Sequence, residues 1–239
     1  MTSPLPVSIL WTMFLNRHEI LRPLQLDSSF TKISGILRAS TQYEFPRVRE
    51  LALSCFSKKY SRRPAPYECA HWTHLQEAAQ LALDCRLQEL LPSLLYGVIL
   101  ISDFHVEEDL ISPTGISTPH VDNEVPATSY LHTVCGRLIK KIIHHFAPVL
   151  FTVATGDHME CTELLADHWM NLAIQPAIDD SGVYKPLETL KRIQNIDWAS
   201  LGLCEECCKA KREEWDEEAD SFWSKLEEWT KLDSDIYLS

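Results

Sequence analysis

The sequence predicts an all-α protein, an irregular helical bundle that ends in a long acidic helix. In most segments the apolar residues recur at intervals of three and four, the period of a helix, and no segment sustains the period of two that a strand needs. Only 7 residues are glycine, against 13 prolines. This composition disfavours tight hairpins between strands and glycine-rich phosphate loops.

The first helices are expected on either side of a short break near residue 45. Asp27 is a suitable N-cap for a helix that continues to about Ser40, and Pro46 fits the first turn of the next. Residues 61–67 form a basic, proline-rich connector after it. The residues expected on the inner faces of these two helices are Phe30, Ile33, Ile36 and Leu37, then Val48, Leu51, Ala52, Cys55 and Phe56.

The central part of the chain predicts the core helix. Thr73 is expected to cap a helix that starts beside it, with Leu75 at the head of its apolar stripe. Residues 90–101 are apolar on almost every side, which indicates a helix at the centre of the core. Residues 102–128 contain three prolines and a glycine, and we expect a long flexible surface loop there.

The C-terminal part predicts further helices over residues 129–146, 161–172 and 187–193, with a loop around Pro176 and Gly182. The last helix is expected over residues 204–232. Because Phe222 and Trp223 are neighbours, we expect one of them to point away from its apolar seam. The seam residues, spaced alternately by three and four, are Trp215, Ala219, Phe222, Leu226, Trp229 and Leu232.

Charge and hydropathy exclude some classes of protein. The net charge is −12, which disfavours nucleic-acid binding because the phosphate backbone is also negative. The longest apolar stretch is too short to cross a membrane. The N-terminus has neither the basic start nor the cleavage site of a signal peptide. We therefore expect an intracellular protein, in the nucleus or the cytoplasm, whose eight cysteines are reduced or bound to a metal.

A candidate zinc site lies in the second half of the chain. Cys204 and Cys207 are three residues apart at the start of a predicted helix, so both thiols face the same side. A closed tetrahedral site needs two further ligands. We choose Cys161 and His168 as this second pair, with His158 as the substitute. The alternative is that the cysteines are small buried apolar residues without a metal.

No catalytic pattern is recognisable in the sequence. There is no nucleophile elbow, no HExxH pair and no Walker loop, which favours a non-enzymatic protein. The neighbouring His144 and His145 face different directions and cannot share a metal as an i, i+4 pair would. Most of the seven tryptophans lie late in the chain, and we interpret them as core residues of the last helix rather than as anchors for a partner.

Three segments together resemble the fungal BTB/POZ-domain proteins, notably the large basidiomycete set. The stretch FTKISGILRASTQYEFPRVRELALSCFSKKY is similar to the closing helices of the BTB domain, and HLQEAAQLALDCRLQELLPSLLYGVI to the unit that follows it. LGLCEECCKAKREEWDEEADSFWSKLEEWTKL resembles the family's cysteine-containing tail, although Glu227 stands where the family often has proline. The resemblance covers about residues 10–235 and lacks the sheet half of the BTB domain.

The resemblance implies a protein-interaction module. Residues 1–63 would be a partial BTB-like helical segment, and residues 64–239 its C-terminal helical extension. Because the sheet half builds much of the family's dimer interface, the resemblance does not extend to homodimerisation or to docking on a cullin-type ubiquitin ligase. The partner we expect is another protein. The alternatives are a zinc-stabilised structural domain without a partner of its own, or a truncated, non-functional paralogue.

Overall fold

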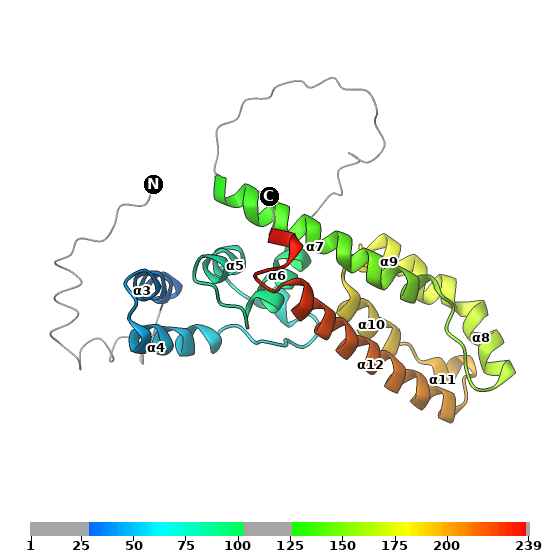
Figure 1. Cartoon of the computed structure of the whole chain (residues 1–239). Coiled ribbons are helices and arrows are strands. Elements are labelled where there is room, and N and C mark those ends of the chain that lie inside the picture. Colours follow the sequence, from blue (N-terminus) through cyan, green and yellow to red (C-terminus); the bar gives the residue numbers. More distant parts are fainter. Residues whose placement is uncertain (1–28, 103–125, 238–239) are drawn as a thin grey trace, which may run out of the picture.

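A computed structural model describes residues 29–102 and 126–237. All regular secondary structure in these two stretches is helical, which confirms the predicted all-α class. The predicted N-cap Asp27 and residues 103–125 of the predicted loop lie outside the described residues. In Figure 1, α3 and α4 stand at one end of the molecule, and α8 and α11 stand at the other.

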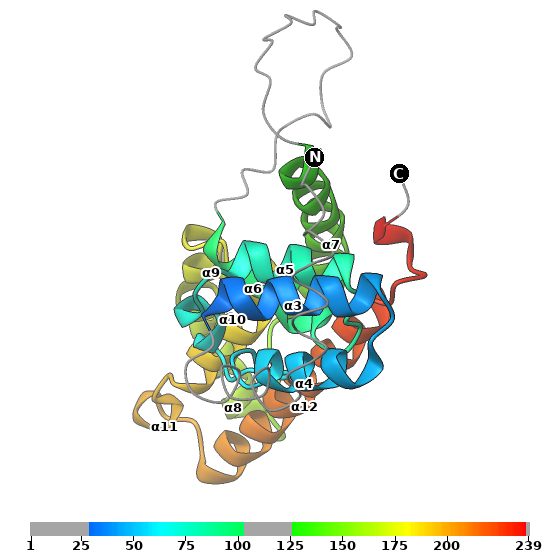
Figure 2. The ribbon, with the colours of Figure 1, turned by 90° about the vertical axis from the view of Figure 1, so that its left-hand side faces the viewer.

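The first described stretch confirms the predicted order of helices. Ile33 and Leu37 of the first helix and Ala52 and Phe56 of the second are buried, so both apolar stripes face inward as expected. Figure 2 shows α3 in front of α5 and α6, with α4 below. The helices of this stretch are α3 (Phe30–Gln42), α4 (Pro46–Ser57), α5 (Leu75–Asp84) and α6 (Leu91–Ile101).

Helix α6 occupies the centre of the core, as its uniform hydropathy predicts. Every residue from Leu91 to Ile99 is buried. Gly97 lets α5 approach closely, because a Cβ atom at this position would lie 2.9 Å from Cδ2 of Leu75. A helix surrounded in this way has no solvent-facing side, which explains why its sequence has no polar stripe.

The prediction that Thr73 caps α5 is wrong. The N-cap is His74, whose backbone is left-handed (φ 54°) and whose side chain makes no capping bond. Its ring instead stacks on Phe30 of α3, with ring centroids 4.9 Å apart. The carbonyl of Thr73 accepts a hydrogen bond from the Tyr60 hydroxyl at 2.9 Å. Contacts between helices therefore decide this turn, rather than a local capping pattern.

The second described stretch contains longer and more broken helices than predicted. Figure 1 shows the two long ones, α7 and α12, extending toward the end of the molecule that carries α8 and α11. A π-helical turn, Met170–Ile174, connects α8 to α9. The helices are α7 (Pro126–Phe151), α8 (Met159–Trp169), α9 (Gln175–Asp179), α10 (Pro186–Gln194), α11 (Trp198–Leu201) and α12 (Glu205–Trp229).

Proline positions account for two errors in the predicted boundaries. Helix α7 passes through Pro148 and ends at Phe151 rather than at residue 146. Proline lacks the N–H that would bond to the carbonyl four residues earlier, and the helix ends within one turn of Pro148. The carbonyl of Pro148 still accepts from the hydroxyl of Thr152 at 2.6 Å. Pro176, which we placed in a loop, lies in the first turn of α9, where proline is well tolerated.

The end of α12 buries two adjacent aromatic rings. Phe222 is 0% exposed and Trp223 is 6% exposed, so the expectation that one of them leaves the seam is wrong. Both rings lie edge-on to Tyr96 of α6, at centroid distances of 5.6 and 6.1 Å. The core around α6 therefore buries a wider face of α12 than the narrow seam of a two-helix coiled coil would.

The core consists of two apolar clusters. The first cluster is built around α6 and includes Ile33 and Phe56 from before residue 63, together with Phe222 and Leu226. The second cluster lies among the end of α7, α8, α10, α11 and the first half of α12. At its centre the rings of Trp169, Trp198 and Trp215 pack on one another, with centroids 6.2 to 6.4 Å apart.

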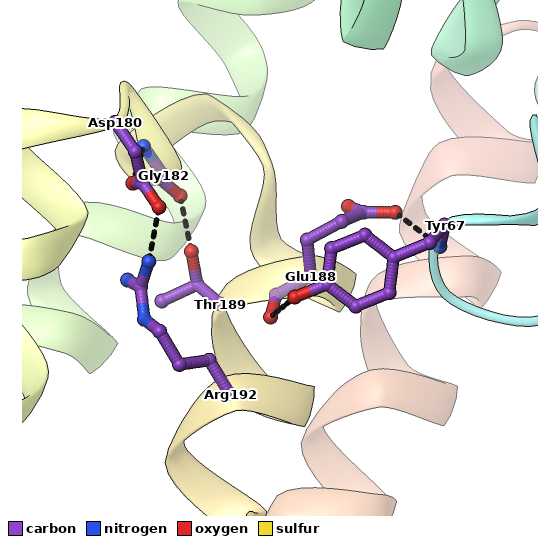
Figure 3. A network of polar contacts seen from close by, with 6 residues as sticks. All are labelled: Tyr67, Asp180, Gly182, Glu188, Thr189 and Arg192. Atoms are coloured by element: carbon purple, nitrogen blue, oxygen red, sulfur yellow. Dashed lines mark hydrogen bonds and ion pairs between the residues drawn. The ribbon is translucent and has the colours of Figure 1, made fainter. Parts of the chain in front are cut away.

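A buried carboxylate joins the two clusters. Glu188 on α10 accepts a hydrogen bond from the Tyr96 hydroxyl and another, at 3.1 Å, from the backbone N–H of Tyr67. The Tyr67 hydroxyl donates to the backbone carbonyl of Glu188 at 3.1 Å, as Figure 3 shows. On the same helix, Thr189 donates to the carbonyl of Gly182 and Arg192 pairs with Asp180. Helix α10 is thus fastened on both sides by polar contacts.

Candidate metal centre

Four side chains at the α8 and α11 end of the molecule form a cluster that could hold a metal ion. They are His158, Cys161, Cys204 and Cys207, and their ligand atoms all lie within 4.8 Å of one another. The imidazole Nδ1 of His158 is 3.4 Å from the sulfur of Cys204, 3.5 Å from that of Cys207 and 4.0 Å from that of Cys161. Each residue therefore offers one donor atom to a common centre.

The cluster joins the beginnings of two helices in the same way. His158 is the N-cap of α8 and Cys161 follows three residues later, and Cys204 is the N-cap of α12 with Cys207 three residues later. An N-cap side chain and the residue at the third helical position face each other at the first turn. The backbone N–H of Cys207 donates to the sulfur of Cys204 at 3.4 Å.

The turn before α8 brings its backbone against the thiols. The Thr162 hydroxyl donates to the carbonyl of Gly156 at 3.0 Å, and the N–H of Gly156 donates to the same hydroxyl at 3.0 Å. A Cβ atom at Gly156 would lie 2.9 Å from Cβ of Cys161 and 3.3 Å from the sulfur of Cys207. Only glycine lets the chain pass this close to both cysteines.

Hydrogen bonding prepares one thiol for ionisation. Burial opposes a charge on Cys207, but backbone N–H groups of Asp157 and His158 and the thiols of Cys204 and Cys161 outweigh it and lower the pKa of Cys207 to about 7. The N-termini of α8 and α12 also favour negative charge at this place. Cys207 is therefore the thiol most ready to act as an anionic ligand.

Cys161 shows the cost of placing three thiols together. A backbone hydrogen bond from Cys204 lowers the pKa of Cys161, but burial and the neighbouring thiols of Cys204 and Cys207 outweigh it, and the pKa is raised. Thiolates crowded in one place repel each other unless a cation lies between them. The electrostatics of the cluster are thus those of a site that gains from a bound cation.

The structure brings together three of the four ligands chosen from the sequence and replaces the fourth. His168 is not in the cluster, and its place is taken by His158, the substitute. His168 lies seven residues after Cys161 in α8, about 10 Å further along the helix axis, because each residue adds about 1.5 Å. Cys208 is also outside the cluster, and its thiol contacts the carbonyl of Leu203 at 3.7 Å.

The sequence contains a signal that identifies His158. His158 and Cys161 have the same spacing as Cys204 and Cys207, and each pair stands at the start of a helix. Two such pairs place all four donors on the first turns of two helices, whereas His168 stands two turns away. The matching spacing of the two pairs is therefore more informative than the number of histidines near Cys161.

The wider context of the chain comes from its helices and from comparisons with known proteins. None of the helices within the described stretches is both long and apolar enough to cross a membrane. Comparison with protein-family models, with curated proteins and with solved structures gives no match for this chain.

Proposed function

We propose that the chain is a non-enzymatic, zinc-stabilised helical domain in which His158, Cys161, Cys204 and Cys207 bind one zinc ion. Thiolate and imidazole donors suit zinc, and four protein ligands leave no coordination position for water or substrate. A closed site of this kind contributes folding free energy rather than chemistry. In this chain it would hold the start of α8 against the start of α12.

The spacing of the donor atoms carries the proposal. Zinc lies about 2.3 Å from sulfur and about 2.0 Å from nitrogen, so a tetrahedral site places sulfur and nitrogen about 3.6 Å apart. The three distances from His158 Nδ1 to the sulfurs, 3.4, 3.5 and 4.0 Å, lie close to this value. Cys204 and Cys207 both lie more than forty positions after His158 in the sequence. The match is therefore created by packing of the helices and not by proximity along the chain.

Metal analysis of the purified full chain tests the proposal. We expect one zinc per chain, and a chelator should remove it with loss of stability. His158→Ala should weaken zinc binding at least about tenfold, because it removes one of four ligands. His168→Ala and Cys208→Ser are matched controls that should leave binding unchanged. Absence of stoichiometric zinc, or equal losses in His158→Ala and His168→Ala, would overturn the proposal.

A second candidate function is a protein-interaction module, which the resemblance to BTB proteins implies. It is supported by a mostly apolar groove of about 470 Å³ that is lined by residues of α7, the segment after it, α8, α10 and α12. Its walls include Pro148 and Val149 of α7, Val153 of the following turn, and Trp169 and Trp215 of the second cluster. Val153 is 41% exposed, so apolar surface remains open to a partner.

Dye binding and sedimentation test this second candidate. A fluorescent dye for exposed apolar surface should bind the full chain and quench the groove tryptophans, and Val153→Asp should weaken that binding. The same substitution at Val183, which is half-buried and lies away from the groove lining, is the control. Analytical ultracentrifugation that shows only monomers, together with a titration that shows no dye binding, would remove the basis for an interaction surface.

A further inference from the structure

We propose that the metal centre is a peroxide-sensitive site, at which oxidation of Cys204 and Cys207 to a disulfide releases the zinc ion. The inference rests on the proposed zinc site and adds a means of controlling it. It follows from three features of the cluster, namely the unequal exposure of its thiols, the pairing of Cys204 with Cys207, and the dependence of the site on two helix starts.

The thiols differ in their access to solvent. Cys204 is half-buried, whereas Cys161 is 6% exposed and Cys207 is 1% exposed. Thiolate oxidation follows both thiolate character and access to the oxidant. A small peroxide therefore meets Cys204 first.

The second thiol of the reaction is already in place. The N–H of Cys207 points at the sulfur of Cys204 at 3.4 Å, and the two sulfurs belong to one helical turn. Cys-X-X-Cys pairs at helix N-termini are the arrangement in which reversible disulfides form. The sulfur of Cys161 also lies within 4.8 Å of that of Cys204, but Cys161 belongs to α8, whereas Cys204 and Cys207 share the first turn of α12.

The chemistry balances with hydrogen peroxide as the oxidant. The Cys204 thiolate attacks one peroxide oxygen, the O–O bond breaks, and hydroxide leaves and takes up a proton as water. The Cys207 thiolate then attacks the sulfur of the resulting sulfenic acid, the S–S bond forms, the S–O bond breaks and a second water leaves. Two thiolates are oxidised, two oxygen atoms are reduced, and two protons are consumed.

The disulfide removes two of the four ligands at once. The remaining pair, His158 and Cys161, belongs to α8 alone and cannot hold a tetrahedral zinc. The start of α12 is then no longer tied to the start of α8, and the second cluster loses this link between two of its helices. Reduction by a dithiol would restore both thiolates and allow zinc to return.

The test uses the full zinc-loaded chain, hydrogen peroxide and a chromogenic zinc indicator. We expect one zinc to be released per chain, a mass decrease of two hydrogens, and a Cys204–Cys207 disulfide in peptide mapping. A dithiol with added zinc should reverse all three changes. Cys208→Ser should behave like the unmodified chain, because Cys208 is outside the cluster.

The decisive variant is Cys204→His, which keeps four ligands but removes the exposed thiol. The zinc affinity of this variant is measured first, and its peroxide-driven release, taken above its own peroxide-free rate, should be at least about tenfold slower because the remaining thiols are buried. Equal release rates in this variant and the unmodified chain, or a disulfide that maps to Cys208, would overturn the inference. Failure of the unmodified chain to bind zinc would instead overturn the proposed function, so the two failures are distinguishable.

Discussion

The first and second clusters hold their helices together by different means. The first surrounds α6, whose residues from Leu91 to Ile99 are all buried, and it draws on helices from both described stretches. The second contains fewer buried apolar residues, has three tryptophans packed on one another at its centre, and shares Cys161 and Cys207 with the cluster that could hold a metal ion. A helix buried on all sides needs no further support, whereas short helices such as α11, with four residues, do.

Under the proposed function, this difference gives a reason for a metal site at one end of the molecule and not at the other. Burial of apolar surface stabilises in proportion to area, and the second cluster has less of it to contribute. In the proposed zinc-bound form, the ion would tie the first turns of α8 and α12 together and so add to this packing.

Zinc removal should loosen the second cluster and leave the first intact. The stabilisation lost is about 4 kcal/mol if free zinc exceeds its dissociation constant about 1,000-fold. Amide hydrogen exchange after chelation measures it region by region. We expect large losses of protection in α8 and the first half of α12 and none in α6. Equal losses in α6 would show that the two clusters unfold as one unit.

Leu94→Ala should damage the first cluster whether or not zinc is bound. Leu94 is 0% exposed in the middle of α6, and a buried leucine truncated to alanine costs about 3 kcal/mol. Denaturant unfolding with and without chelator measures the loss. Leu201→Ala, at a residue 37% exposed, is the control and should cost less than about 0.5 kcal/mol. A Leu94→Ala loss that disappears on chelation would contradict independent clusters.

Much of the fold is predictable because helical period and burial agree along most of the chain. Ile33, Leu37, Ala52 and Phe56 all face inward as their spacing indicates. The failures occur where contacts between helices override a local signal. His74 adopts a left-handed conformation while its ring stacks on Phe30, and no pattern around Thr73 encodes that contact.

The candidate metal cluster is predictable in part for a related reason. The spacing of Cys204 and Cys207 is local and identifies one half of the site. The other half depends on which face of α8 meets α12, and this is set by packing of side chains such as Leu165 and Trp169 in the second cluster. The prediction of His168 rested on its closeness to Cys161 in the sequence. In the structure, both pairs occupy the first turn of a helix, and His158 rather than His168 stands there.

Gly156→Ala should weaken zinc binding without removing a ligand. Its Cβ atom would lie 2.9 Å from Cβ of Cys161 and 3.3 Å from the sulfur of Cys207, so both ligands must shift. We expect an affinity loss of about 10-fold to 100-fold, the usual effect of disturbing the surroundings of metal ligands. Competition with a chelating indicator measures it.

Gly136→Ala is the matched control for this substitution. Gly136 lies inside α7 with nothing within 4 Å of its added Cβ, so alanine should leave zinc binding unchanged. It should also stabilise the helix by about 0.5 to 1 kcal/mol. An unchanged zinc affinity in Gly156→Ala would mean that the turn before α8 does not constrain the thiols.

The smallest effect is expected at Glu188, which joins the two clusters. Burial raises the pKa of this carboxyl above its usual 4.5, although hydrogen bonds from Tyr96 and the backbone of Tyr67 oppose the change. A raised pKa in the folded state means that Glu188 contributes stability below pH 4.5 and that this contribution is lost as the pH rises through the folded value. Glu188→Gln cannot ionise and should escape that loss.

The Gln variant should therefore gain stability relative to the unmodified chain as the pH rises from about 4 to 7, by less than about 1 kcal/mol. Denaturant midpoints at several pH values measure the difference. A variant whose disadvantage grows toward pH 7 would mean that the charged carboxylate is held by Tyr96 and Tyr67 more strongly than burial opposes it. The hydrogen bonds from Tyr96 and Tyr67 would then require a charged acceptor at position 188 rather than tolerate a neutral one.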